Sequence, residues 1–176
     1  MKYRERNEAE REAYKDELAG IADDKRIYYI DETGKNKGLE REYGYAPKGK
    51  LVEGETDGKK AETLNIVAAK CGNDMVEVHE YDCNMNARLF ELWFMLLLKC
   101  VEPGSYLIMD NARFHRAAVL GEMAEAADCH VLFLPAYSPD LNPIEQEWAN
   151  LKKFLRNHGR DYALTSDAVF HYFCSA

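Results

Sequence analysis

The alternation of apolar and polar residues along the chain first predicts three β-strands. Residues 27–32 are β-branched and aromatic, and the Thr-Gly pair at 33–34 is expected to end this strand just after Asp31. Two further strands are predicted at 63–70 and 75–81, joined by a glycine-containing turn. Together the three strands can form an antiparallel meander.

The second half of the chain alternates helical patterns with short apolar runs. A helix is predicted at residues 86–100, which are apolar nearly all round after Leu92, as is typical of a helix buried against a sheet. Continuous apolar runs at 106–110 and 130–134 indicate strands covered on both faces. Further helices are predicted at residues 116–127, 143–157 and 166–174. The order β-β-β-α-β-α-β-α predicts an α/β fold with a mixed sheet and helices on its faces.

Two segments stand outside this pattern. Residues 2–19 alternate Lys or Arg with Glu, which predicts a solvated helix held by ion pairs between neighbouring turns. We therefore expect residues 1–25 to be a charged helix or linker and residues 26–176 to form the domain. Residues 34–58 are rich in glycine and lysine and predict a long functional loop with a short extended piece at 43–46.

The composition is that of a globular protein with one core. The chain has 176 residues, of which 47% are hydrophobic and 31% charged. It contains no apolar stretch long enough to cross a bilayer, and its five scattered cysteines suit reduced thiols in the cytosol. The formal net charge of −8 argues against a nucleic-acid partner. The uneven distribution of charge weakens this objection, because the acidic excess is concentrated in residues 61–150.

Three carboxylates fall where the predicted sheet would bring them together. Asp31 and Asp110 each follow an apolar strand, and Glu145 lies in the first turn of the helix after the last strand. Ligands of open α/β sheets gather in the crevice at such strand ends. Three carboxylates without histidine or cysteine partners suit hard divalent cations and a two-metal phosphoryl-transfer site.

Each acid also has a purely structural alternative. Glu145 could complete a capping box with Asn142 as the helix cap and Pro143 as the first helical residue. Asp110 could form a turn together with Asn111. Strand alternation places Asp31 and the neighbouring Glu32 on opposite faces, so only one of the two can enter the site.

The predicted helix 143–157 has two distinct faces. Its apolar stripe consists of Ile144, Trp148, Leu151 and Leu155, all expected in the core. The adjacent face carries Glu145, Ala149, Lys152 and Arg156 at helical spacing. An acid and two cations on one face would suit a scissile phosphate and its neighbours, whereas the alternative is that the two cations are merely solvated. A surface role is expected for Glu147.

Two strings of residues resemble the catalytic domain of mariner-like DDE transposases, in particular the bacterial insertion-sequence branch. They are Asp-Asn-Ala-Arg-Phe-His at 110–115 and Leu-Pro-Ala-Tyr-Ser-Pro-Asp-Leu-Asn-Pro-Ile-Glu-Gln-Glu-Trp at 134–148. Between Asp110 and Glu145 lie 34 residues, the spacing typical of that branch. The resemblance implies a ribonuclease H-like fold, two Mg²⁺ ions per site that Mn²⁺ can replace, and cut-and-paste DNA transposition.

The resemblance also implies roles for particular residues. Asp31, Asp110 and Glu145 correspond to the catalytic, metal-binding acids, and Asn111 and His115 to auxiliary residues. His115 could orient a phosphate or water, or it could hold the loop by a structural hydrogen bond. Residues 43–49 resemble the family's glycine- and aromatic-containing loop. From the charge pattern, and not from the resemblance, the expected DNA-contacting residues are Lys48, Lys50, Arg113, Lys152 and Arg156. The basic loop from Lys35 to Lys50 could instead contact a partner subunit or simply be solvated.

Members of this family carry helix-turn-helix domains ahead of the catalytic domain, and no such segment precedes Ile27. We therefore expect a catalytic half that acts in the bacterial cytoplasm near the nucleoid, as a homodimer or with a helix-turn-helix-bearing subunit, and without a membrane partner. Its substrate would be the DNA of transposon ends and a TA target. The alternative is a non-catalytic truncated product that pairs with full-length subunits and represses them. A junction resolvase or ribonuclease would keep the fold and change the substrate.

Overall fold

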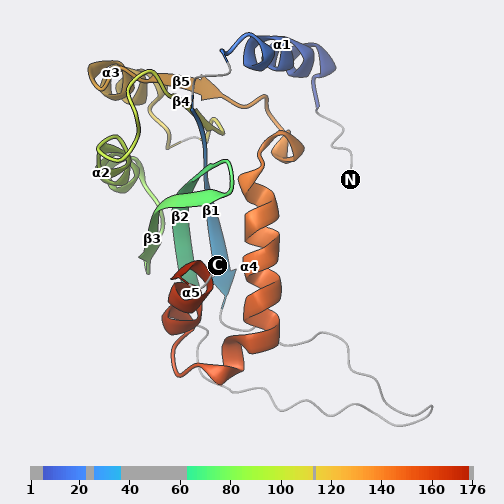
Figure 1. The fold of residues 1–176 in the computed structure, drawn as a ribbon, viewed down its shortest axis with the longest axis vertical. Helices are drawn as coiled ribbons and strands as arrows, with labels where there is room; N and C mark the ends of the chain where they lie inside the picture. Colours follow the sequence, from blue (N-terminus) through green and yellow to red (C-terminus); the bar gives the residue numbers. More distant parts are fainter. Residues whose placement is uncertain (1–5, 23–25, 37–62, 113, 175–176) are drawn as a thin grey trace, which may run out of the picture.

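The computed structural model describes residues 6–22, 26–36, 63–112 and 114–174 (Figure 1). The strands are β1 (Ile27–Asn36), β2 (Thr63–Cys71), β3 (Asp74–Tyr81), β4 (Tyr106–Met109) and β5 (His130–Phe133). The α-helices are α1 (Glu8–Ala19), α2 (Ala87–Leu97), α3 (Ala117–Ala126), α4 (Ile144–His158) and α5 (Thr165–Cys174). Short 3-10 turns, η1 (Pro139–Leu141) and η2 (Gly159–Asp161), flank α4.

The sheet is mixed, with strand order β3-β2-β1-β4-β5. Strands β1, β2 and β3 pair antiparallel, as the meander prediction requires. Strand β1 also pairs parallel with β4, and β4 pairs parallel with β5. The predicted α/β class and mixed sheet are confirmed, and this topology is that of a ribonuclease H-like fold.

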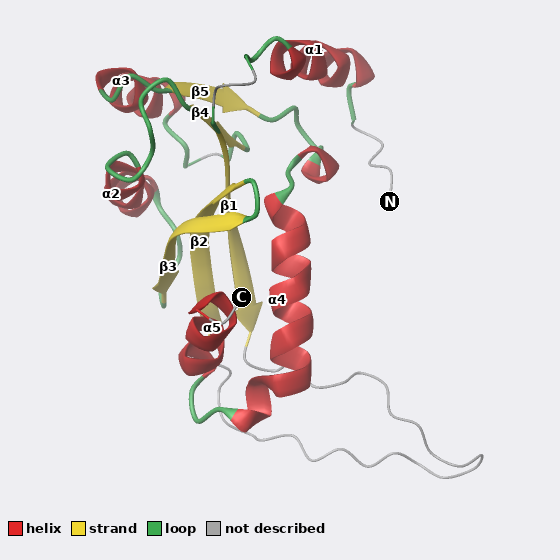
Figure 2. Cartoon of the chain, in the orientation of Figure 1, coloured by secondary structure: helices red, strands yellow, loops and turns green. Residues whose placement is uncertain are grey.

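Helices cover both faces of the sheet. In Figure 1, α2 and α3 lie on one side and the long helix α4 on the other, with α5 beside it. Figure 2 shows the same layers coloured by secondary structure. Alternate residues of β2 enter the two layers, because Val67 and Ala69 pack with α2 and α3 whereas Ile66 and Ala68 pack with α4 and α5. The sheet is therefore buried on both faces, which explains its nearly continuous apolar strands.

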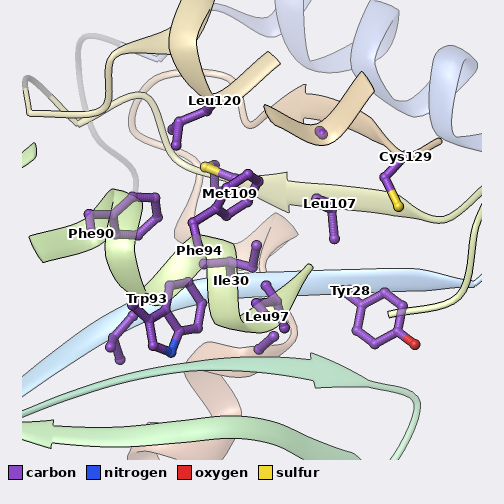
Figure 3. Packing of buried hydrophobic residues seen from close by; sticks show 13 residues of the cluster. Tyr28, Ile30, Phe90, Trp93, Phe94, Leu97, Leu107, Met109, Leu120 and Cys129 are labelled. Atoms are coloured by element: carbon purple, nitrogen blue, oxygen red, sulfur yellow. The ribbon is translucent and has the colours of Figure 1, made fainter. Parts of the chain in front are cut away.

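The core on the α2 side is largely aromatic. Phe90, Trp93, Phe94 and Leu97 project from α2 onto the sheet, where they meet residues such as Leu107 of β4 (Figure 3). Burial of large apolar side chains at this density is the main favourable contribution to folding. This layer anchors β4, the strand that leads directly into Asp110.

The expected end of the first strand at residues 33–34 is wrong. Strand β1 continues to Asn36, and Gly34 pairs with Asn65 of β2. A Cβ at Gly34 would lie only 2.8 Å from the side-chain oxygen of Asn65. The glycine permits this close approach within a continuous strand rather than marking a turn.

The N-terminal helix is confirmed as a helix, but the prediction that it is fully solvated is wrong. Tyr14 is 4% exposed and packs in a cluster with Ile108 of β4 and Leu134. Arg11 is also buried and forms a two-pronged ion pair with Asp140, with Nη2 2.8 Å from Oδ2 and Nη1 3.2 Å from Oδ1. Arg6 pairs with the same carboxylate. Alternation of charges alone did not reveal that one face of α1 packs on the domain.

Most of the loop predicted at residues 34–58, including its extended piece at 43–46, lies outside the described residues, which stop at Asn36 and resume at Thr63. In the part of the chain that the structure describes, no helix has the length and apolar character needed to span a membrane.

Candidate active site

The register of β1 and β4 brings two of the predicted acids to the same edge of the sheet. Tyr29 pairs with Ile108 in the parallel ladder, and Asp31 and Asp110 each lie two residues further along their strands. Neighbouring parallel strands thus deliver both carboxylates at corresponding positions. The antiparallel partner β2 continues past this point, so the crevice forms where β4 ends and β1 continues.

The third acid reaches the same place from helix α4. Glu145 is the second residue of α4, and it lines one pocket together with Asp31, Asp110 and Asn111. The pocket has a volume of about 740 Å³. Residues of α1, among them Tyr14, also line this pocket. The structure therefore brings the three predicted acids together in one cavity.

Strand alternation resolves the choice between Asp31 and Glu32. Asp31 points to the α4 side, where its Oδ2 accepts a hydrogen bond from the indole Nε1 of Trp148. Glu32 points to the opposite side, where its carboxylate lies 3.7 Å from Nε2 of His115. Of these two acids, Asp31 lines the pocket together with Asp110 and Glu145, and Glu32 does not.

The surroundings of Asp31 shift its pKa upward. Burial, followed by the negative charges of Glu145 and Asp110, raises the pKa of Asp31 to about 7. Hydrogen bonds from the backbone of Glu32 and from Trp148 oppose this rise. A partly buried acid with a raised pKa beside two like charges in a cavity is typical of a functional site.

The loop after β4 holds Asp110 by two short-range contacts. Asp110 Oδ1 accepts a hydrogen bond from the backbone N–H of Ala112 at 3.1 Å, so the turn role predicted for Asp110 is present. His115 Nδ1 donates to the backbone carbonyl of Asp110 at 2.8 Å. Both contacts fix the start of the loop while the Asp110 side chain stays exposed at the pocket.

His115 lies beneath this loop rather than in the pocket. Its side chain is only 3% exposed and packs against the ring of Phe90 at a centroid distance of 4.2 Å. Burial would lower the pKa of His115, but Glu32 and the contacts with Asp110 outweigh burial and raise it. The structural hydrogen bond that we weighed for His115 is thus observed.

The capping-box alternative for Glu145 is wrong. Helix α4 begins at Ile144 with Pro143 as the capping residue, one position later than predicted. The Asn142 backbone instead ends η1, and its side-chain Oδ1 has no hydrogen-bond partner among the described residues. Glu145 is consequently not engaged in a cap and is exposed at the pocket.

The two faces predicted for α4 are present. Its apolar stripe, Ile144, Trp148, Leu151 and Leu155, is fully buried. Lys152 and Arg156 lie further along the adjacent face, about 10 and 16 Å from Glu145 at the rise of an α-helix, and neither lines the pocket. Neither cation forms an ion pair with another described residue.

Glu147 does not have the purely surface role that we expected. It accepts a hydrogen bond from the Tyr172 hydroxyl at 2.6 Å and from Lys70 at 3.3 Å. These contacts connect α4 to α5 and to β2. The contribution of Glu147 is structural.

Three of the predicted DNA-contacting residues, Lys48, Lys50 and Arg113, lie outside the described residues. The glycine- and aromatic-containing loop at 43–49 does so as well.

The donor set fits a hard divalent cation, although it is not a closed cage. No three His, Cys, Asp or Glu side chains among the described residues form a ready-made metal cluster. Mg²⁺ is commonly held by one or two carboxylates, with water and substrate phosphates completing its shell. A cation beside Asp31 would also offset the burial and the repulsion from Glu145 and Asp110 that together raise its pKa. Three acids lining an open cavity suit this mode of binding.

The sequence matches the model of the DDE superfamily endonuclease family over residues 26–166, and the chain belongs to this family. This range contains all three acids, and it leaves out α1. No curated protein matches the chain.

Solved structures of the Mos1 mariner transposase have the same fold. The Mos1 paired-end complex with the left transposon end matches with a TM-score of 0.67 and 18% identity, over 82% of this chain and 46% of that chain. The Mos1 catalytic domain matches with a TM-score of 0.61 and 18% identity, over 87% of this chain and 73% of that one. A Mos1 paired-end complex with Mg matches at 0.66 and 19% identity, over 87% and 51%. The chain thus spans about half the length of the Mos1 chains in those complexes.

Two parts of the site were not recognised in the sequence. Trp148 was expected only in the core, but its indole also contacts Asp31. Helix α1 was not expected near any site, although Glu10, Tyr14 and Glu17 line the pocket. The three-residue spacing of Trp148 from Glu145 was visible in the sequence, whereas the direction of its N–H depends on tertiary packing.

Proposed function

We propose that this chain is the catalytic domain of a DNA transposase, which cleaves phosphodiester bonds at transposon ends and joins the freed end to target DNA. The observation that carries this proposal is the convergence of Asp31, Asp110 and Glu145 in one pocket of a ribonuclease H-like fold. Membership in the DDE superfamily endonuclease family supports the same chemistry.

Asp31, Asp110 and Glu145 would hold the divalent cations, which we propose to be two Mg²⁺ ions with Mn²⁺ as a substitute. Related folds were solved as Mos1 complexes with Mg and with Mn, which supports this choice. When bound, such ions activate the attacking oxygen and stabilise charge on the leaving oxygen.

The chain's own residues would supply positioning and charge. Trp148 orients Asp31, and the loop fixed by His115 orients Asp110. Lys152 and Arg156 would bind phosphates on either side of the scissile bond. In the proposed cut-and-paste reaction, water first attacks the phosphodiester, and the freed 3′-hydroxyl then attacks the target at a TA step. Phosphoryl transfer needs little beyond such positioning and charge stabilisation.

We further propose that the chain acts as a homodimer or with a helix-turn-helix-bearing subunit that recognises the element's ends. Two Mos1 neighbours are DNA assemblies, a paired-end complex and a strand transfer complex, and they support a DNA partner. End recognition by a separate domain would explain how an acidic chain finds a specific DNA site.

The test is nicking of a supercoiled plasmid in the presence of Mn²⁺. We expect nicking by the wild-type protein and its loss, by a factor of about 10³ or more, in Asp110→Asn and in Glu145→Gln. Glu125→Gln, an exposed change on α3 across the sheet, is the matched control and should nick normally. Nicking that persists in either site variant would exclude that residue from the catalytic set.

A further inference from the structure

We propose that Trp148 is a positioning residue of the metal site, whose indole N–H fixes the Asp31 carboxylate and sets helix α4 against strand β1. This inference rests on the proposed function, because it assigns Trp148 a task in the reaction that the three acids would carry out. Trp148 touches no substrate in this role and acts only through Asp31.

The geometry leaves the indole one orientation. Trp148 is 1% exposed and packs with Ile66 and Ala68 of β2 and with Leu151 of its own helix. Its Nε1 lies 3.0 Å from Asp31 Oδ2. An indole has a single N–H and can only donate, so a ring locked by packing holds its acceptor in one place. The Asp31 carboxylate therefore cannot rotate without breaking this hydrogen bond.

A neutral donor is well suited to this position. A lysine or arginine beside Asp31 would place a positive charge next to the group that is to hold a cation. The indole satisfies one oxygen of a half-buried acid without competing for its charge. The remaining lone pairs of the carboxylate stay available to a metal ion.

The same hydrogen bond couples two of the acids. Trp148 follows Glu145 by three residues, which corresponds to about 4.5 Å along the helix axis. Because Trp148 is bonded to β1, any sliding of α4 along the sheet would break the contact and move Glu145 away from Asp31. The hydrogen bond thus sets the relative position of the strand acid and the helix acid.

The test compares Trp148→Phe with Trp93→Phe in the full chain. Trp93 is a matched control because it is equally buried and its Nε1 also makes one hydrogen bond, to the Glu77 carbonyl at 2.8 Å, on the other side of the sheet. Both variants lose a buried indole and should lose comparable stability in urea. We expect only Trp148→Phe to bind Mn²⁺ about 10- to 100-fold more weakly by calorimetry. Plasmid nicking by Trp148→Phe should need correspondingly more Mn²⁺.

Equal Mn²⁺ affinity in Trp148→Phe and the wild type would overturn the inference, and so would equal losses in both tryptophan variants. If Trp148→Phe does not fold, the wild-type protein still gives an answer. The chain has two tryptophans, so its two indole N–H resonances can be assigned with Trp93→Phe. Saturating Mg²⁺ should shift the Trp148 resonance and not that of Trp93, and an unshifted Trp148 signal would contradict the proposal.

The outcomes also separate this inference from the proposed function. A wild-type protein that neither binds Mn²⁺ nor nicks DNA would overturn the proposed function and this inference with it. A wild-type protein that does both, beside a Trp148→Phe variant with unchanged Mn²⁺ dependence, would overturn the inference alone.

Discussion

Asp31 combines a partly buried position with two like-charged neighbours, and its ionisation in the metal-free protein therefore opposes folding. Its pKa is raised from 3.8 to about 7, first by burial and then by the charges of Glu145 and Asp110. The folded protein consequently holds a proton between about pH 4 and pH 7 that the unfolded chain has released. The contribution of Asp31 to the free energy of unfolding therefore falls as the pH rises from about 4 to 7, and it is lowest above pH 7.

Replacing Asp31 by asparagine should therefore stabilise the metal-free protein at alkaline pH. Asparagine keeps an oxygen that can accept from Trp148 and removes the charge. We expect Asp31→Asn to raise the free energy of unfolding by about 2 kcal/mol at pH 8. This is less than the free energy that corresponds to the whole pKa shift of Asp31. The difference should shrink towards pH 4. Urea unfolding in EDTA at both pH values measures it, and a variant less stable than the wild type at pH 8 would contradict the account.

At the scale of elements, apolar periodicity predicted nearly every helix and strand. The continuous apolar runs predicted β4 and β5, and the apolar stripe from Ile144 to Leu155 predicted α4. These patterns are informative because burial within or against a sheet requires them. The fold class follows from the order of these elements. The positions of Asp31 and Asp110 after their apolar runs were enough to predict that they meet at one edge.

The sequence was less informative where one residue type serves two purposes. Gly34 permits close approach to Asn65 in a strand, although Thr-Gly is a common turn signal. Arg11 is buried although its helix is mostly charged, because Asp140 lies opposite it in a distant segment. These contacts join residues that are 31 and 129 positions apart in the chain, and no local pattern encodes them.

Helix α1 is attached to the domain by an ion pair. Its residue Arg11 binds Asp140, which lies in the segment that leads into Glu145. We expect Arg11→Ala to lower the free energy of unfolding by about 1–2 kcal/mol, between the values for exposed and buried ion pairs, since Asp140 is half exposed. Lys15→Ala removes an exposed pair with Glu12 on the same helix and should leave the free energy of unfolding nearly unchanged.

Equilibrium unfolding in urea distinguishes the two α1 variants. Equal effects of Arg11→Ala and Lys15→Ala would show that α1 does not rely on the buried ion pair for its attachment.

At the scale of the whole molecule, the charge distribution bears on the proposed DNA binding. The chain has a net charge of −8, and the pocket that holds Asp31 is lined by further acids, including Glu10 and Glu17 of α1. Any attraction to DNA must therefore come from local cations such as Lys152 and Arg156 on α4. Binding by this chain should be weak and should fall steeply with salt.

Removal of these cations should change the salt dependence in a defined way. We expect Lys152→Ala and Arg156→Ala each to weaken binding to a fluorescent DNA duplex and to reduce the slope of log K against log salt by about 1. Lys99→Ala, an exposed change after α2 on the other side of the sheet, is the control and should leave the slope unchanged. An unaltered slope in both α4 variants would remove this helix face from the DNA-binding surface.

The central claim is that Asp31 and Asp110 belong to one metal site, and a calorimetric titration of Mn²⁺ tests it most directly. The wild-type protein is compared with the Asp31→Asn/Asp110→Asn double variant, whose two changed residues each lie two positions beyond the paired residues Tyr29 and Ile108. The account predicts saturable binding by the wild type that the double variant loses. Equal binding by the two proteins would contradict it.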